Sequence, residues 1–166
     1  LVTKLSPKHM TNPSVDVQKA FNQSIFELFD NNELITSTFS TIKGVLDCYL
    51  MHWVAPHGSS PENFTENNEI RIQCWLEMEK LYWKGLVRSI GVSNFTTKHL
   101  QLLLSDERIT VVPHVNQVEI HPLYDQLELR EFCSQRGIQI QAYSSLGQAN
   151  LLNHEKIIKY AKKCKL

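Results

Sequence analysis

Reactive and hydrogen-bonding side chains stand at or near the ends of five short apolar runs in this 166-residue chain. They comprise an ammonium, an imidazole, a hydroxyl, two amides and a phenol, at Lys4, His52, Ser93, Asn94, Gln117 and Tyr143. Ammonium and imidazole groups stabilise charge or exchange protons, whereas hydroxyls and amides hold a ligand by hydrogen bonds. The pattern predicts a site built where several strands end.

Five segments rich in β-forming residues alternate with segments of helical period. The predicted strands are Leu1–Leu5, Val45–Trp53, Arg88–Asn94, His114–Ile120 and Gly137–Ser144. The predicted helices are Asn67–Leu86, Thr96–Leu104, Gln126–Arg136 and Asn153–Cys164. Because the strands are apolar and alternate with helices, the sequence predicts a parallel sheet covered by helices.

Such an α/β sheet is either an open doubly wound sheet or a (β/α)8 TIM barrel. The G-x-G-x-x-G turn that commonly follows the first strand of a dinucleotide-binding open sheet is absent. A barrel gathers the carboxyl ends of its strands into one active site, which fits the polar strand ends. A barrel typically needs about 250 residues. We therefore expect a (β/α)8 barrel that is incomplete in this chain, an internal piece with five strand–helix units.

The charge balance argues against highly charged partners. Lys and Arg number 17, as do Asp and Glu, so the net charge is zero. No overall field draws the chain to nucleic acid or to an anionic membrane, and we expect neither partner. The four cysteines lie far apart without a CxxC pair, which argues against a metal site and a disulfide framework. We expect reduced thiols in a cytoplasmic protein.

Five local strings resemble the aldo-keto reductase family. GLVRSIGVSNF (Gly85–Phe95) and VNQVEIHP (Val115–Pro122) are similar to two of its strands with their following turns. LDCYLMHW (Leu46–Trp53), VTKL (Val2–Leu5) and QAYSSLG (Gln141–Gly147) look like its histidine, lysine and aromatic cofactor strands. They occur in the family's order and correspond to roughly the third to seventh barrel strands. The resemblance implies a partial barrel domain over residues 1–166.

The resemblance implies NADPH-dependent reduction of aldehydes or ketones, with a small-molecule carbonyl compound as the partner. Lys4 matches the catalytic lysine, whose ammonium lowers the pKa of a tyrosine proton donor. His52 matches the histidine whose neutral imidazole donates a hydrogen bond to the substrate carbonyl. Trp53 then lines the substrate pocket. Without the resemblance, the ordinary interpretation of Lys4 is a solvated lysine. That of His52 is a core histidine whose hydrogen-bonding groups have partners.

The resemblance also implies contacts to NADPH. Ser93, Asn94 and Gln117 match the residues that hydrogen-bond the nicotinamide carboxamide. Tyr143 matches the aromatic residue that stacks on the nicotinamide ring; on its own it reads as ordinary core packing. Asn94 or Thr96 also suits the cap of the following helix.

Further along, Ser144, Leu146 and Gly147 match the loop that meets the pyrophosphate, where backbone N–H groups suit an anion. Two departures from the family accompany this match. A small hydroxyl residue is common in the family where this chain has Gln148, and residues 29–44 form an atypical insertion. The insertion lies on the helix-to-strand side, opposite the expected active site.

The family's tyrosine acid and its aspartate partner have no match in this chain. The resemblance places them on strands before Leu1, and it places the segment for the 2′-phosphate after Leu166. Tyr49 cannot replace the acid, because strand alternation puts it on the face opposite His52. We therefore expect an enzyme that is a monomer at full length, with this chain inactive alone. The alternative is a non-catalytic, aldo-keto-reductase-like nucleotide-binding or structural protein.

Overall fold

The computed structural model describes residues 1–28, 46–60 and 63–164. The strands are β1 (Val2–Leu5), β2 (Cys48–Met51), β3 (Ile90–Ser93), β4 (Val115–Glu119) and β5 (Gln139–Tyr143). The helices are α1 (Pro13–Leu28), α3 (Phe64–Trp83), α4 (Thr97–Leu104), α5 (Leu127–Ser134) and α6 (Glu155–Lys163), with a short 3-10 turn η1 (Pro7–His9). All predicted strands and helices are present. The expected insertion at residues 29–44 lies outside the described residues.

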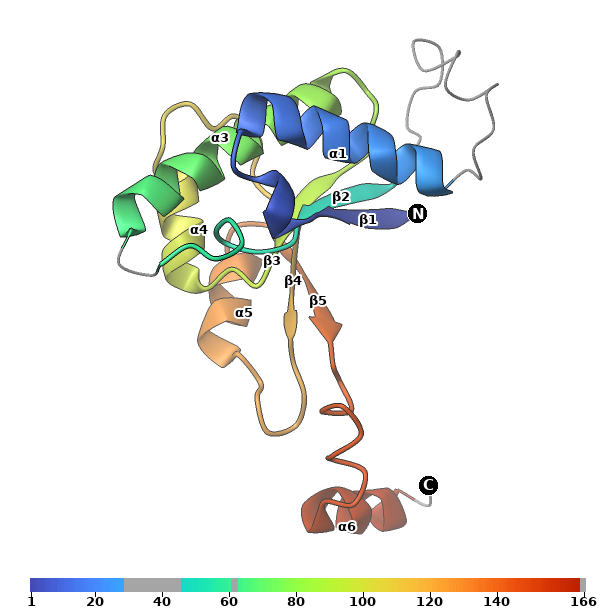
Figure 1. Cartoon of the computed structure of the whole chain (residues 1–166). Helices are drawn as coiled ribbons and strands as arrows, with labels where there is room; N and C mark the ends of the chain where they lie inside the picture. The colour runs from blue at the N-terminus through green and yellow to red at the C-terminus, as the bar shows by residue number, and fades with distance from the viewer. Residues whose placement is uncertain (29–45, 61–62, 165–166) are drawn as a thin grey trace.

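The order of the strands distinguishes the two expected architectures. The five strands form one parallel sheet in the order β1-β2-β3-β4-β5, so each strand pairs with the next one along the chain (Figure 1). A doubly wound sheet reverses its strand order at a switch point, and this sheet does not. Sequential parallel pairing is the arrangement of a barrel wall.

The pairing register divides the sheet into two faces. Partners across all five strands share one face, the inner face, which carries Lys4, Leu50, Gly91, Val115 and Gln139. The adjacent residues belong to the outer face, which packs under α1, α3, α4 and α5. Outer-face residues in the buried core include Leu5, Met51, Val92 and Val118. The apolar core therefore lies between the sheet and the helices.

A buried carboxylate fixes α3 to the segment that leads into β4. Glu79 is only 5% exposed. It accepts hydrogen bonds from the Trp75 indole N–H (3.1 Å) and from the backbone N–H groups of Thr110 (2.9 Å) and Val111 (2.8 Å). A buried charge is tolerated when its lone pairs are satisfied in this way. Trp75 and Glu79 together hold the longest helix in place.

The helix α3 begins three residues before the predicted start. Asn67 is not its first residue but is buried inside its first turns, where its side chain donates to the Ser60 carbonyl (2.9 Å). The helix ends at Trp83 because Gly85 adopts a φ of 71°, a conformation that glycine reaches without steric cost. The predicted end near Gly85 is confirmed.

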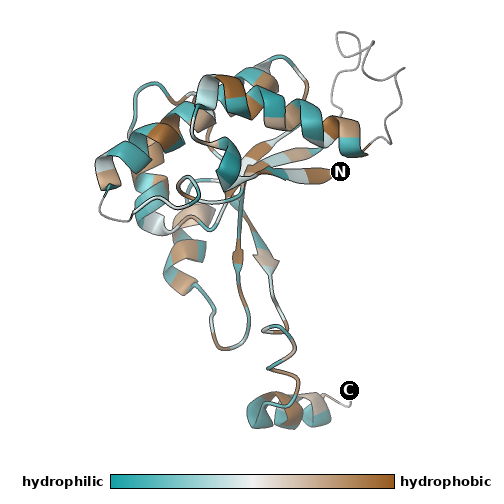
Figure 2. Cartoon of the chain, in the orientation of Figure 1, coloured by the Kyte–Doolittle hydropathy of each residue, from teal (hydrophilic) through white to brown (hydrophobic). Residues whose placement is uncertain are grey.

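Hydrophilic and hydrophobic residues alternate along α1 and α3, as expected for helices with one face on a core and the other in solvent (Figure 2). The last helix, α6, differs from these because none of its residues is buried. It lies beyond the carboxyl end of β5, apart from the other helices (Figure 1). Across the described residues, no helix combines the length and apolar character needed to cross a membrane.

Candidate active site

Lys4 and His52 lie on the inner face at the carboxyl ends of β1 and β2. The backbone N–H of His52 donates to the Leu5 carbonyl (3.1 Å), so the ladder between the two strands continues to the histidine. Burial lowers the pKa of Lys4. Burial, and after it the positive charge of Lys4, lowers the pKa of His52 below the ordinary histidine value. The imidazole is therefore neutral at pH 7 and can donate a hydrogen bond without carrying charge.

Tyr49 lies on the outer face. Its ring meets that of Phe21 on α1 edge-on at 5.6 Å between centroids, and its side chain is fully buried. Burial raises the pKa of its hydroxyl far above the ordinary value. The expectation that alternation directs Tyr49 away from His52 agrees with this placement. Tyr49 is therefore not a proton donor at the strand ends.

The end of β3 is tied to both neighbouring strands. The Ser93 hydroxyl donates to the Gln117 carbonyl (2.8 Å), and the Asn94 backbone N–H donates to the same oxygen (3.0 Å). The Asn94 side-chain nitrogen donates to the His52 carbonyl (2.9 Å). Asn94 adopts a left-handed φ of 62°, which asparagine tolerates better than most residues. This backbone conformation lets its short side chain reach back to β2.

Two further contacts bring β5 into the same cluster. The Tyr143 hydroxyl donates to the Asn94 side-chain oxygen (2.6 Å), and the Gln117 side chain donates to that of Gln141 (2.8 Å). Burial, followed by the negative charge of Glu119, raises the pKa of Tyr143. The structure thus brings together the predicted residues Asn94, Gln117 and Tyr143 at one end of the sheet.

A pocket of about 210 Å³ opens at these strand ends. It is lined by residues from the ends of β2 to β5 and the following loops, including Trp53, Asn94, Glu119, Tyr124, Gln126 and Tyr143. Trp53 is 45% exposed, and its ring centroid lies 5.8 Å from that of His52. The predicted pocket residue Trp53 and the predicted cofactor residues Asn94 and Tyr143 therefore share one cavity.

The predicted pyrophosphate loop lies elsewhere. Ser144, Leu146 and Gly147 follow β5 and do not line this pocket. Ser144 and Gly147 adopt left-handed φ values of 49° and 53°, and the Gly147 N–H donates to the Ser144 carbonyl (2.7 Å). Leu146 is 61% exposed. The three residues form a tight turn on the path from β5 towards α6.

Sequence reasoning gave no role to Glu119, Tyr124, Gln126 or Gln141. The signal for two of them is strand alternation. Glu119 lies two residues after Gln117, and Gln141 lies two residues before Tyr143, so each shares the inner face with a predicted site residue. Tyr124 and Gln126 belong to the loop after β4; the sequence predicted Gln126 as the first residue of a helix, but it precedes α5 with a left-handed φ of 53°.

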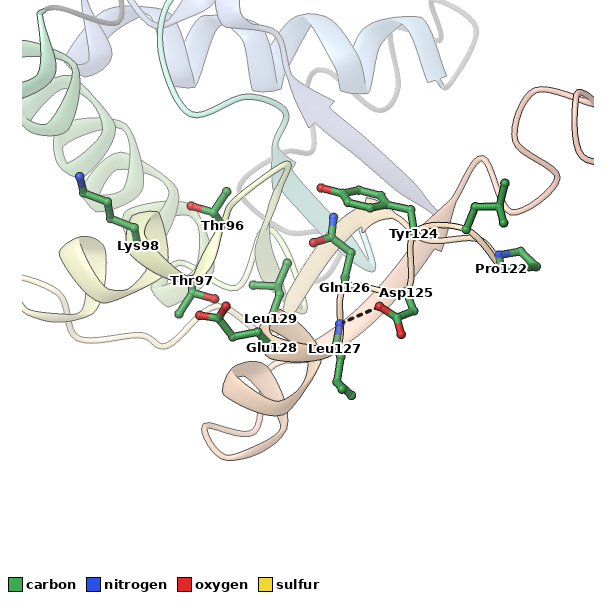
Figure 3. Close-up of a pocket in the computed structure, with 11 residues that line it drawn as sticks. Thr96, Thr97, Lys98, Pro122, Tyr124, Asp125, Gln126, Leu127, Glu128 and Leu129 are labelled. Atoms are coloured by element: carbon green, nitrogen blue, oxygen red, sulfur yellow. Dashed lines mark hydrogen bonds between the residues drawn. The ribbon is translucent and has the colours of Figure 1, made fainter.

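A larger cavity of about 660 Å³ lies between the beginnings of α4 and α5 (Figure 3). None of the predicted site residues lines it. Its lysine, Lys98, places its ammonium over the Phe64 ring, 4.8 Å from the centroid. In Figure 3 this side chain points away from the acidic residues Asp125 and Glu128. Of the predicted site residues, Trp53, Asn94 and Tyr143 line the smaller pocket, whereas Lys4, His52, Ser93 and Gln117 do not.

The sequence of this chain is similar to those of known proteins. The model of the Aldo/keto reductase family matches residues 35–164. Glyoxal reductase of Bacillus subtilis (strain 168) is 42% identical over 118 residues, which are 71% of this chain and 38% of that protein. Aldehyde reductase YPR1 of Saccharomyces cerevisiae is 37% identical over 138 residues, covering 71% of this chain and 44% of that protein.

Solved structures give the same result at the level of the fold. An aldo/keto reductase from Brucella melitensis superposes with a TM-score of 0.73 and 32% identity, covering 99% of this chain and 53% of the other. A mutant of Gox0644 in complex with NADPH gives a TM-score of 0.75 and 30% identity, covering 99% and 51%. The chain thus spans about half the length of these structures. The five strands are part of a (β/α)8 barrel, and the chain belongs to the aldo/keto reductase family.

Proposed function

We propose that the protein reduces aldehydes or ketones to alcohols with NADPH. One observation carries the proposal: at the strand ends of an aldo/keto reductase scaffold, the backbone of His52, whose imidazole is neutral, is hydrogen-bonded to a linked group of amides and a phenol. Similar proteins bear the names glyoxal reductase and aldehyde reductase, which supports a carbonyl substrate.

The amide and phenol groups at the strand ends fit a nicotinamide carboxamide, which both donates and accepts hydrogen bonds. Asn94 and Gln117 offer amide groups on the same side of the sheet, and the half-buried Tyr143 ring offers an aromatic surface. We assign these three residues, with Ser93 supporting Gln117, to the cofactor. When bound, NADPH supplies the hydride that reduces the carbonyl carbon. Ser144, Leu146 and Gly147 are proposed to contact its pyrophosphate.

His52 is proposed to orient the substrate. Its neutral imidazole donates a hydrogen bond to the carbonyl oxygen and so polarises the carbonyl bond. Burial lowers the pKa of His52 and so keeps the imidazole uncharged, and the positive charge of Lys4 adds to this effect. The same ammonium is proposed to stabilise the phenolate of the family's tyrosine acid, which the resemblance places outside this chain. Trp53 forms a wall of the substrate pocket.

We also propose a cytoplasmic monomer as the setting for this reaction. The scattered cysteines support the compartment, and the zero net charge supports a partner that is not highly charged. A small carbonyl compound, rather than nucleic acid or a membrane, is the proposed partner.

The test measures carbonyl-dependent NADPH oxidation by the native protein and by a His52→Ala variant. We expect kcat to fall by roughly 10²- to 10³-fold, the usual cost of removing one hydrogen-bond donor to an oxygen that gains negative charge in the reaction. His57→Ala, at an exposed histidine outside the pocket, is the matched control and should keep its rate. Unchanged rates in His52→Ala would remove His52 from the mechanism. NADPH binding without turnover in the native protein would favour the non-catalytic alternative.

A further inference from the structure

A hydrogen bond between Tyr143 and Asn94 spans the sheet across β4. The two residues come from β5 and from the end of β3, which are not neighbours in the strand order. The phenol oxygen and the amide oxygen are 2.6 Å apart. The bond therefore joins two predicted cofactor residues that the sheet itself does not hold together.

The orientation of the Asn94 amide follows from its other partner. The His52 carbonyl only accepts hydrogen bonds, so the Asn94 atom facing it at 2.9 Å is the nitrogen. The oxygen then faces Tyr143, whose hydroxyl must donate. Burial raises the pKa of Tyr143, so the phenol keeps its proton and remains a donor at neutral pH.

The contacts of Asn94 use both of its hydrogen-bond donors and leave part of its acceptor capacity free. An asparagine amide has two N–H donors and two acceptor lone pairs. The donors face the His52 carbonyl and the Ser93 hydroxyl (3.3 Å), and one lone pair is taken by Tyr143. What remains is a single lone pair on the amide oxygen. Asn94 is thus prepared to accept a hydrogen bond from a ligand and not to donate one.

We propose that the Tyr143 hydroxyl is a positioning group that holds the Asn94 oxygen ready to accept from the amino group of the nicotinamide carboxamide. This role is separate from the stacking expected of the Tyr143 ring, and it rests on the proposed NADPH function. Without the hydroxyl, the Asn94 amide is held only through its nitrogen, by the His52 carbonyl and the Ser93 hydroxyl, and its oxygen has lost its own partner. The oxygen is then held less firmly, and the carboxamide meets a less preorganised acceptor.

The test compares two cofactors in the full-length protein. In the 3-acetylpyridine analogue of NADPH a methyl group replaces the carboxamide amino group, so it cannot donate to Asn94. Binding is measured as Kd by fluorescence titration, without any turnover. For Tyr143→Phe, which keeps the ring, we expect Kd for NADPH to rise roughly five- to tenfold, as for one lost hydrogen bond. We expect Kd for the analogue to change by less than twofold.

Two variants complete the design. Tyr160→Phe removes a hydroxyl from a residue of α6 that is 70% exposed, and should leave both affinities unchanged. Asn94→Ala should show the same selective loss for NADPH, and the double variant with Tyr143→Phe should lose little more than Asn94→Ala alone.

The outcomes separate the two proposals. If the unmodified protein binds NADPH and Tyr143→Phe weakens both cofactors equally, the hydroxyl acts on the fold or on stacking, and the inference is overturned. Equal affinities in Tyr143→Phe and the unmodified protein overturn it as well. If the unmodified protein does not bind NADPH, the proposed function itself fails.

Discussion

Met51 and His52 are adjacent in the chain and lie on opposite faces of the sheet. Met51 faces outward and is fully buried in the core under the helices, whereas His52 follows on the inner face at the carboxyl end of β2 and is only partly buried. The same contrast recurs on β4. Val118 packs outward, while its neighbours Gln117 and Glu119 face inward. The outer face thus stabilises the fold through apolar burial, and the inner face carries the polar groups.

We expect the largest loss of stability when a buried side chain of the outer face is truncated and leaves a cavity. Met51→Ala removes a fully buried side chain, and we expect the free energy of unfolding to fall by about 2–5 kcal/mol. Denaturant-induced unfolding measures this change. His52→Ala is the matched substitution one residue away, and it should cost less than about 1 kcal/mol because the side chain is only partly buried. Equal losses in the two variants would contradict the division between the faces.

Gly91 lies on the inner face, but we expect its substitution to destabilise the fold as substitutions on the outer face do. A Cβ on Gly91 would lie 2.5 Å from the Val115 carbonyl oxygen and 2.8 Å from a methyl group of Leu50. Because backbone cannot yield easily, Gly91→Ala should cost about 1–3 kcal/mol of unfolding free energy. Gly58→Ala, where nothing lies near the added Cβ but φ is 80°, reports the cost of backbone strain alone. A Gly91→Ala variant as stable as the unmodified protein would refute the predicted steric clash.

A smaller, pH-dependent effect should arise on the outer side. His99 closes a capping box with Thr96 at the start of α4, accepting from the Thr96 backbone N–H (3.3 Å). Burial, followed by the charges of Arg71 and Lys98, lowers the pKa of His99 to about 4. Between the unfolded value of about 6.5 and about 4, the unfolded chain binds more protons, so stability falls as the pH falls.

Replacing the histidine by glutamine tests this assignment. His99→Gln keeps a residue that suits a capping box and does not titrate. The loss of thermal stability between pH 7 and pH 4.5 should therefore be smaller in His99→Gln than in the unmodified protein. His9→Gln, at an exposed histidine, is the control and should leave the pH dependence unchanged. Identical pH profiles for His99→Gln and the unmodified protein would exclude His99 as the source.

The smallest effect is expected at an exposed inner-face position. Gln141 accepts a hydrogen bond from Gln117 and is open to solvent. Gln141→Ala should change the unfolding free energy by no more than about 0.5 kcal/mol in thermal or chemical unfolding. A clear destabilisation would show that the inner-face amides also support the fold.

Strand alternation made much of this arrangement predictable. A period of two residues predicted the strands that carry Lys4 and His52. It also predicted that Tyr49 lies on the face opposite His52. Element boundaries were less predictable, because the start of α3 depends on Asn67 finding a carbonyl partner seven residues earlier. A local pattern does not encode that contact.

The contacts between side chains of distant strands were not predictable either. The bond between Tyr143 and Asn94 joins residues 49 positions apart, and it depends on the left-handed backbone at Asn94. Buried Asn116, next to Gln117, is a similar case: its side chain donates to the Phe95 carbonyl (2.9 Å). Sequence reasoning identified the amides that could bind a carboxamide, but their partners depend on the tertiary fold.

The sequential order of the five strands also bears on how the chain folds. Within the described residues, each strand from β2 to β5 pairs with the strand that precedes it in the chain. Contacts of moderate sequence separation favour faster folding, because less chain entropy is lost before each contact forms. The sheet can therefore add β2, β3, β4 and β5 one after another as these segments are synthesised. After each addition the newest strand presents a free edge, which the next strand to emerge from the ribosome covers.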